Sequence, residues 1–140
     1  MTVAALVAKL LASTNAGEAK PVVDALVKLL CEITDLELHP AMFIDEHATI
    51  TAQGKAVSPT TAAQCAEDVE RTRIFMQGVH AAIEEKLQNN NHQPIDILYA
   101  GTGPFGLLLI PLLPLLDAAL IRVTLLDIHA ESLDKLQHLL

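Results

Sequence analysis

The sequence predicts a mixed α/β fold in which a helical region precedes the start of a parallel sheet. Up to about residue 90, apolar residues recur mainly at spacings of three and four, the period of an amphipathic helix. The pattern then changes to two mostly apolar runs, Ile95–Ala100 and Val123–Leu126, which are typical of buried parallel strands. This change predicts three parts: an N-terminal helical region at 1–57, a helix and linker at 58–93, and a βαβα unit at 94–140. A parallel sheet with only two strands is incomplete.

The helical part is expected to contain three helices. The first carries an apolar stripe that begins at Val3, and the second begins near Pro21, because proline suits the first turn of a helix. His39-Pro40 should end this region, and a short hairpin or extended loop is expected at 48–57. The third helix should start at Ser58, a good cap followed by proline, and continue to about Leu87.

Composition excludes some classes of protein. The 140 residues suit one domain, or a small domain with part of another. Seventeen acidic residues against nine Lys and Arg argue against a nucleic-acid surface. Cys31 and Cys65 form no CxxC motif and are expected to pack in the core. Because the N-terminus also lacks the basic flank of a signal peptide, a reducing, cytoplasmic location is expected.

The stretch 97–116 is apolar enough and long enough to span a bilayer. Three glycines and three prolines interrupt it, however. A strand followed by a short or kinked crossover helix explains the same residues, since proline disrupts a helix at Pro111 and Pro114. No membrane span is expected.

The most informative motif is the glycine-rich run Gly101-Thr102-Gly103-Pro104-Phe105-Gly106, which follows the first strand. Its glycines permit a tight turn and a close approach of a ligand to the backbone. A helix beginning near Pro104 would direct free N–H groups at that ligand. Asp127, which ends the second strand, can accept hydrogen bonds from a ribose diol. These features predict a site for a nucleoside-bearing cofactor, and the alternative is a loop that only turns the chain.

The preceding helix contains Asp68-Val69-Glu70-Arg71-Thr72, a D-x-x-R-T motif, followed by Phe75. With the downstream glycine motif, this arrangement resembles the class I S-adenosylmethionine-dependent methyltransferases, and most closely the protein arginine methyltransferase-like group. The resemblance covers Ser58 to the C-terminus. It implies a Rossmann-like parallel sheet, a cofactor-lid helix at 58–93, and S-adenosylmethionine as the cofactor.

The same resemblance implies roles for individual residues. Arg71 would meet the carboxylate of the cofactor's methionine part, and Asp127 would bind the ribose. Tyr99 stands where the family has Asp or Glu and would offer its hydroxyl or ring face to the ammonium group. The expected cofactor-binding residues are Arg71, Tyr99, Gly101, Thr102, Gly103, Phe105, Asp127 and Ile128.

Several alternatives stay open. The chain is expected to be a methyltransferase or the cofactor-binding N-terminal fragment of one, with an unknown acceptor. The other readings are an NAD- or FAD-binding oxidoreductase domain and a non-catalytic helical interaction protein with a degenerate cofactor fold. Arg71 could instead be a solvated helix residue paired with Glu67 or Asp68.

No metal site is expected, because the histidines lack HxxxH spacing and Asp45-Glu46-His47 is typical of a solvated loop. His129 is expected at the rim of the cofactor pocket. Two strands leave a sheet edge and a sheet face open, which predicts self-association or contact with a missing C-terminal portion.

Overall fold

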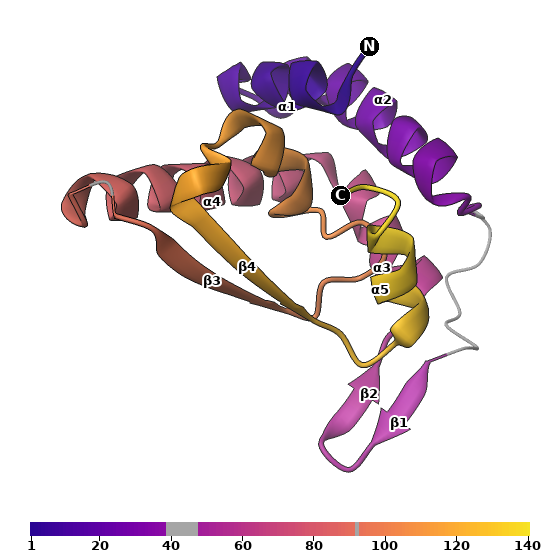
Figure 1. Ribbon diagram of the computed structural model, residues 1–140. Helices are drawn as coiled ribbons and strands as arrows, with labels where there is room; N and C mark the ends of the chain where they lie inside the picture. The colour runs from indigo at the N-terminus through magenta and orange to yellow at the C-terminus, as the bar shows by residue number, and fades with distance from the viewer. Residues whose placement is uncertain (39–47, 92) are drawn as a thin grey trace.

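The structure is a computed structural model that describes residues 1–38, 48–91 and 93–140. It is a mixed α/β fold with two small sheets of two strands each. In Figure 1, helices α1 and α2 form an upper layer, helix α4 lies beneath them, and strands β3 and β4 lie on the far side of α4. The expected helix end at His39-Pro40 and the triplet Asp45-Glu46-His47 lie outside the described residues.

Two capped helices form the upper layer. The Thr2 hydroxyl caps α1 (Val3–Ala12), and the Asn15 side chain caps α2 (Ala16–Thr34) by accepting a hydrogen bond from the Glu18 N–H at 3.0 Å. The start of α2 expected near Pro21 was wrong, because the Asn15 cap begins the helix earlier and Pro21 is tolerated inside it.

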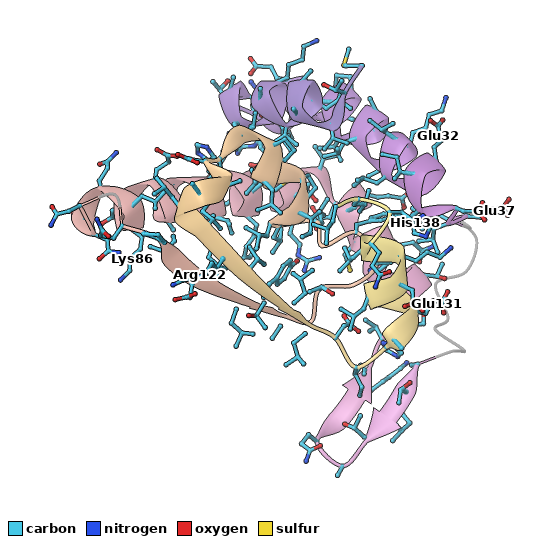
Figure 2. The ribbon with its side chains drawn as sticks, viewed as in Figure 1. Glu32, Glu37, Lys86, Arg122, Glu131 and His138 are labelled. Carbon is cyan, nitrogen blue, oxygen red and sulfur yellow. The ribbon has the colours of Figure 1, made fainter. Side chains whose placement is uncertain are left out.

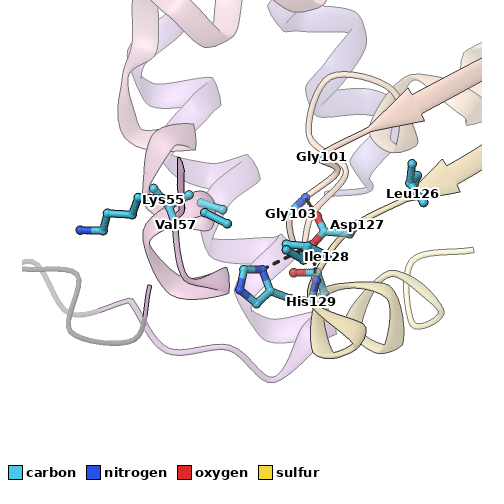
Figure 3. A pocket seen from close by; sticks show the side chains of 11 residues that line it. Lys55, Val57, Gly101, Gly103, Leu126, Asp127, Ile128 and His129 are labelled. Atoms are coloured by element: carbon cyan, nitrogen blue, oxygen red, sulfur yellow. Dashed lines mark hydrogen bonds and ion pairs between the residues drawn. The ribbon is translucent and has the colours of Figure 1, made fainter. Parts of the chain in front are cut away.

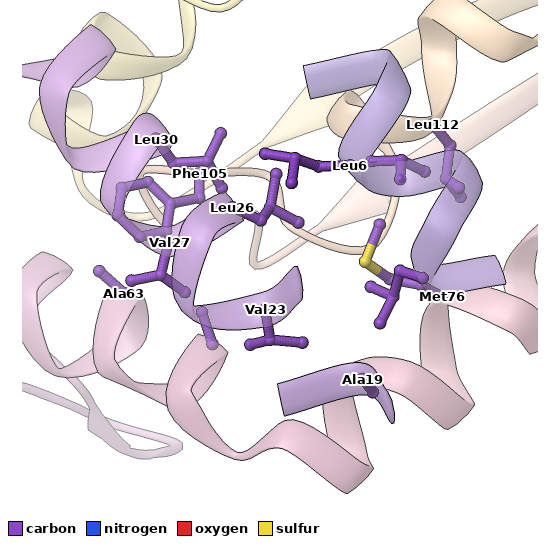
Figure 4. Packing of buried hydrophobic residues seen from close by; sticks show 13 residues of the cluster. Leu6, Ala19, Val23, Leu26, Val27, Leu30, Ala63, Met76, Phe105 and Leu112 are labelled. Carbon is purple, nitrogen blue, oxygen red and sulfur yellow. The ribbon is translucent and has the colours of Figure 1, made fainter. Parts of the chain in front are cut away.

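The main core lies between this upper layer and the elements below it. Figure 4 shows it as a contiguous group of aliphatic side chains joined by one methionine and one phenylalanine. Phe105 and Leu112 reach it from the connection between the two parallel strands, although most of its members come from α1 and α2. Among the buried members are Leu6, Val7, Leu10, Val23, Leu26, Leu30, Met76, Phe105 and Leu112.

The single helix expected from Ser58 to Leu87 was wrong. The structure instead has α3 (Pro59–Gln64), a 3-10 helix η1 (Cys65–Glu67) and α4 (Val69–Asn89). Asp68 separates them because its backbone is extended and its carboxylate accepts the Arg71 N–H at 3.1 Å, which starts α4 afresh.

This break changes the position of one cysteine. Cys65 falls in η1 and is exposed, so its expected place in the core was also wrong. Cys31 is partly buried against the main core, as expected. The Ser58 cap of α3 is confirmed, with its hydroxyl accepting the Thr61 N–H at 3.3 Å.

The hairpin expected at 48–57 is confirmed. Strands β1 (Thr49–Thr51) and β2 (Gly54–Ala56) pair antiparallel. The second strand begins at Gly54, whose φ of 138° favours glycine. Figure 1 shows the hairpin at the lower end of the molecule, below α3 and α5.

The two predicted strands pair in parallel, as β3 (Ile95–Ala100) and β4 (Ile121–Leu126). Their register runs from Ile95 opposite Ile121 to Ala100 opposite Leu126. One face of this pair carries residues that pack with Ile83 and Leu87 of α4. The other face is bare, with Leu98 67% and Leu126 57% exposed. The expected open face of the sheet is thus present.

The connection between these strands differs from the expectation. The α-helix expected near Pro104 was wrong: residues 101–120 form turns and two 3-10 helices, η2 (Ile110–Leu115) and η3 (Ala118–Leu120). Pro111 and Pro114 both lie in η2, where their missing N–H groups prevent regular α-helical bonding. Helix α5 (Ala130–Leu136) follows β4.

None of the helices in residues 1–38, 48–91 and 93–140 combines the length and the apolar character needed to cross a membrane.

Candidate functional site

The glycine-rich turn leaves β3 at its carboxyl end and packs against α3. Gly101 and Gly103 have φ values of 71° and 59°, a region that residues with a side chain rarely adopt. A Cβ added at Gly103 would lie 3.2 Å from the Cβ of Ala62, which is tighter than ordinary packing. Glycine is therefore required at Gly103 for both backbone conformation and space.

The carboxylate of Asp127 holds this turn in place. One oxygen, Oδ2, accepts the Gly103 N–H at 2.8 Å and the Thr102 hydroxyl at 3.3 Å. The other, Oδ1, accepts the backbone N–H of His129 at 2.8 Å. Because only 6% of the Asp127 side chain is exposed, the carboxylate lies at the base of the site, between the ends of the two strands.

His129 connects the same carboxylate to the hairpin. Its Nδ1 lies 3.5 Å from Asp127 Oδ1, and its Nε2 lies 3.1 Å from the Thr49 hydroxyl in β1. Figure 3 shows the imidazole beside Asp127, between the strand end and the hairpin side. The hairpin is thus attached to the end of β4 by a side-chain hydrogen bond.

These elements enclose a pocket of about 610 Å³, a size typical of small-molecule sites. Its walls come from the hairpin and the residues after it, from α3, from the glycine turn, and from the segment between β4 and α5 (Figure 3). The lining residues are Lys55, Ala56, Val57, Ala62, Gly101, Gly103, Leu126, Asp127, Ile128, His129 and Ser132. His129, which was expected near the pocket rim, is one of these lining residues.

Ser132 gives the pocket an unsatisfied polar group. Its side chain is buried and its hydroxyl has no hydrogen-bond partner among the described residues. Buried hydroxyls are nearly always bonded in native proteins, so an unpaired one beside a pocket indicates room for a polar ligand group.

The sequence-predicted residues fall into two groups. Gly101, Gly103, Asp127 and the exposed Ile128 line the pocket, and Thr102 lies beneath it, bonded to Asp127. Phe105 does not line it, because its ring is 2% exposed and packs in the main core.

Tyr99 and Arg71 do not line this pocket, and Tyr99 lines a second pocket that lies between β3 and α4. The Tyr99 hydroxyl accepts the Leu108 N–H at the long distance of 3.5 Å. Burial raises the pKa of Tyr99, the Leu108 N–H lowers it, and the charges of Arg71 and Asp127 act on it in opposite directions. The tyrosine is therefore within electrostatic reach of both ionic groups.

The Arg71 guanidinium is not used in an ion pair with another described residue. It lies 5.9 Å from the ring centroid of Phe75, one turn further along α4. The alternative pairing with Glu67 or Asp68 is not found, since Asp68 bonds the Arg71 backbone N–H instead. An exposed arginine without a carboxylate partner can accept an anionic ligand group.

Sequence reasoning missed six pocket residues: Lys55, Ala56, Val57, Ala62, Leu126 and Ser132. The first three belong to the hairpin side and carry no motif that links them to a glycine turn far along the chain. Leu126 and Ser132 were within reach of the sequence argument, because Leu126 directly precedes Asp127 and Ser132 lies one helical turn after Ile128.

No group of three or more His, Cys, Asp or Glu residues within the described parts of the chain is placed to hold a metal ion. No protein-family model, curated protein or solved structure matches this chain.

Proposed function

We propose that the chain binds S-adenosylmethionine in the 610 Å³ pocket and is the cofactor-binding part of a methyltransferase with a Rossmann-like sheet. The proposal rests on one observation: Asp127, an acid placed where it could bind a ribose, is hydrogen-bonded to the glycine turn that forms the pocket floor. In parallel sheets, nucleoside ligands bind at the carboxyl ends of strands, which is where both features lie.

The hydrogen bonds of Asp127 are compatible with a ribose. A carboxylate offers about four acceptor sites. The bonds from Gly103, Thr102 and His129 occupy three positions, which leaves capacity for a hydroxyl of the ligand. The unpaired Ser132 hydroxyl supplies a further partner in the same pocket. The residues present therefore fit a nucleoside.

The feature that favours S-adenosylmethionine over other nucleosides is Arg71. S-adenosylmethionine ends in an amino acid, and its carboxylate needs a cation beyond the ribose. Arg71 has no competing carboxylate among the described residues and is close enough to affect the pKa of Tyr99, two residues before Gly101.

Binding calorimetry tests this proposal with S-adenosylhomocysteine, NAD and FAD as separate ligands. We expect S-adenosylhomocysteine to bind and the two dinucleotides not to bind. Asp127→Asn should weaken binding at least tenfold, because it removes the charge that strengthens bonds from ribose hydroxyls. Asp96→Asn is the matched control, since Asp96 lies near the opposite end of β3 and pairs with Arg122.

The result that would contradict the proposal is tighter binding of NAD or FAD than of S-adenosylhomocysteine. Failure of all three ligands to bind a folded chain would favour the interaction-protein alternative.

A further inference from the structure

A second pocket, of about 820 Å³, lies on the other side of β3 from β4. It touches Ile95, Asp96, Ile97, Leu98 and Tyr99, which are consecutive residues of one strand. Because alternate side chains point to opposite faces of a sheet, a space that touches consecutive residues must follow the strand edge. This edge groove, bounded by 95–99 on one side and by α4 on the other, is separate from the proposed cofactor pocket.

The backbone along this edge is unpaired. The Gly101 N–H bonds the Leu126 carbonyl at 2.7 Å and so points toward β4. Since N–H and C=O groups alternate sides along a strand, those of Tyr99 and Ile97 also point to β4. The groups of Asp96, Leu98 and Ala100 therefore point to the free edge, where β3 pairs with no other strand of the described residues. Such a row of donors and acceptors is a template for another strand.

The side chains around the groove are mainly apolar, with one free cation. Val79, Ala82 and Ile83 of α4 form the wall opposite β3. The Asp96 carboxylate is neutralised by Arg122, which donates two hydrogen bonds to it at 2.7 and 3.0 Å. Lys86 lines the groove without an ion pair to any described residue, and Figure 2 shows it below α4 near the start of β3.

We propose that the edge groove binds an extended polypeptide segment that adds as a strand to β3, with apolar side chains toward α4 and a carboxylate beside Lys86. The backbone pattern selects a polypeptide, because alternating donors and acceptors along an extended edge are matched by another strand. Lys86 is the cation among the lining residues and selects the acidic end residue, because the Asp96 carboxylate is already paired with Arg122. The occupied length of five residues corresponds to about 17 Å of extended chain.

Two synthetic peptides test whether the carboxylate contributes to binding: acetyl-Val-Thr-Val-Thr-Glu-amide, whose Val and Glu side chains share one face of an extended strand, and the same peptide ending in Lys. Binding is followed by amide chemical shifts of the isotope-labelled chain. The Glu peptide should bind more tightly, and it should shift the amides of Asp96, Leu98 and Ala100 but not those of Gly101 and Gly103. Lys86→Glu should reverse the preference, by roughly threefold for a surface ion pair. Lys9→Glu, on the exposed side of α1, is the matched control and should leave it unchanged.

Two N-methylated forms of the Glu peptide test whether binding depends on backbone hydrogen bonds to the edge of β3. Each form carries methyl groups on alternate residues, so that one form blocks the N–H groups facing β3 and the other blocks those facing away. Only the first should lose binding, and both keep the same side chains.

Equal binding of the two N-methylated forms would show a general apolar site and overturn strand addition. Failure of the Glu peptide to move the edge amides would overturn it as well. Light scattering tests whether the chain forms a dimer without peptide. If it does, and the amides of Asp96, Leu98 and Ala100 shift as the dimer forms, the groove binds a second copy of this chain. Each of these results is independent of cofactor binding at the first pocket.

Discussion

The carboxylate of Asp127 accepts the Gly103 N–H at 2.8 Å, and this bond fastens the end of β4 to the turn that follows β3. Asp127 therefore has a structural role whether or not a ligand is present. Asp127→Ala should lower the free energy of unfolding by about 1–3 kcal/mol, because it leaves the Gly103 N–H unpaired. Urea unfolding measures this change. Thr102→Val, which removes only the longer bond to the same carboxylate, should lower the free energy of unfolding by less. An equal loss of unfolding free energy in both variants would contradict a structural role for the bond between Asp127 and Gly103.

Arg71 provides a test that separates ligand binding from helix stability. Arg71→Lys should weaken S-adenosylhomocysteine binding by about tenfold, because lysine cannot make the two parallel bonds of a guanidinium to a carboxylate. Arg73→Lys is the matched control on the same helix, since Arg73 is already engaged with Glu70 and Gln77. Calorimetry that finds the two variants equally affected would assign Arg71 to the surface alone.

Gly106 and Gly78 should respond in opposite directions to alanine. A Cβ at Gly106 would clash with Ile110 Cγ1, and the φ of 51° disfavours any side chain, so Gly106→Ala should be strongly destabilising. Gly78 lies inside α4 with nothing within 4 Å of an added Cβ. Gly78→Ala should stabilise the chain by about 0.5–1 kcal/mol through helix propensity. Thermal unfolding compares them, and a stable Gly106→Ala variant would contradict the turn conformation.

The Gln77 side chain donates hydrogen bonds to backbone carbonyls at the end of α1, a helix distant from it in sequence. Its Nε2 lies 2.8 Å from the Ser13 carbonyl and 3.1 Å from the Leu11 carbonyl, at the C-terminus of α1. Gln77→Glu keeps the size but removes the donor, and should cost about 1–3 kcal/mol of unfolding free energy. Gln88→Glu, an exposed change near the end of α4, serves as control. Equal melting temperatures for the two variants would rule out this role.

The acid sensitivity of the chain should depend partly on Glu18. The Thr14 N–H, bonded to its carboxylate at 2.8 Å, lowers the pKa of Glu18. A group whose pKa is lower in the folded state stabilises the fold above its unfolded pKa, near 4.3, and loses that effect as the pH falls through the folded value. Glu18→Gln should thus be less stable than the wild type at pH 7, and the two should converge as the pH falls from about 5 toward 2. Unfolding curves across that range measure this convergence. A stability difference between the two proteins that grows as the pH falls would contradict the prediction.

Local patterns predicted much of the fold. The two strands, the hairpin and the glycine turn follow from residue periodicity and turn chemistry, and each was found close to its predicted position. The break at Asp68 was missed because the apolar stripe continues across it, although its carboxylate can cap a new helix. The crossover was expected to be a short or kinked helix because parallel strands are usually joined by a helix, whereas Pro111 and Pro114 lie in a 3-10 helix.

Only the part of the candidate site formed by the ends of β3 and β4 could be predicted from the sequence. Gly101, Gly103 and Asp127 were identified because strand ends and short motifs are adjacent in the sequence. The hairpin wall, with Lys55 and Val57, depends on the long-range bond between Thr49 and His129, which no spacing reveals. Phe105 was assigned to the cofactor on its place in the motif, whereas burial of a large aromatic ring directs it to the core.

The burial of Phe105 makes the glycine turn and the upper helical layer thermodynamically dependent on each other. Its ring packs in the same cluster as Leu26 and Leu30 of α2, so the turn cannot open fully without exposing the interior of that layer. A ligand that binds only the closed turn would shift the opening equilibrium of both regions by the same free energy. Saturating ligand should accordingly slow hydrogen exchange of amides in α2, a helix that contributes no residue to the 610 Å³ pocket.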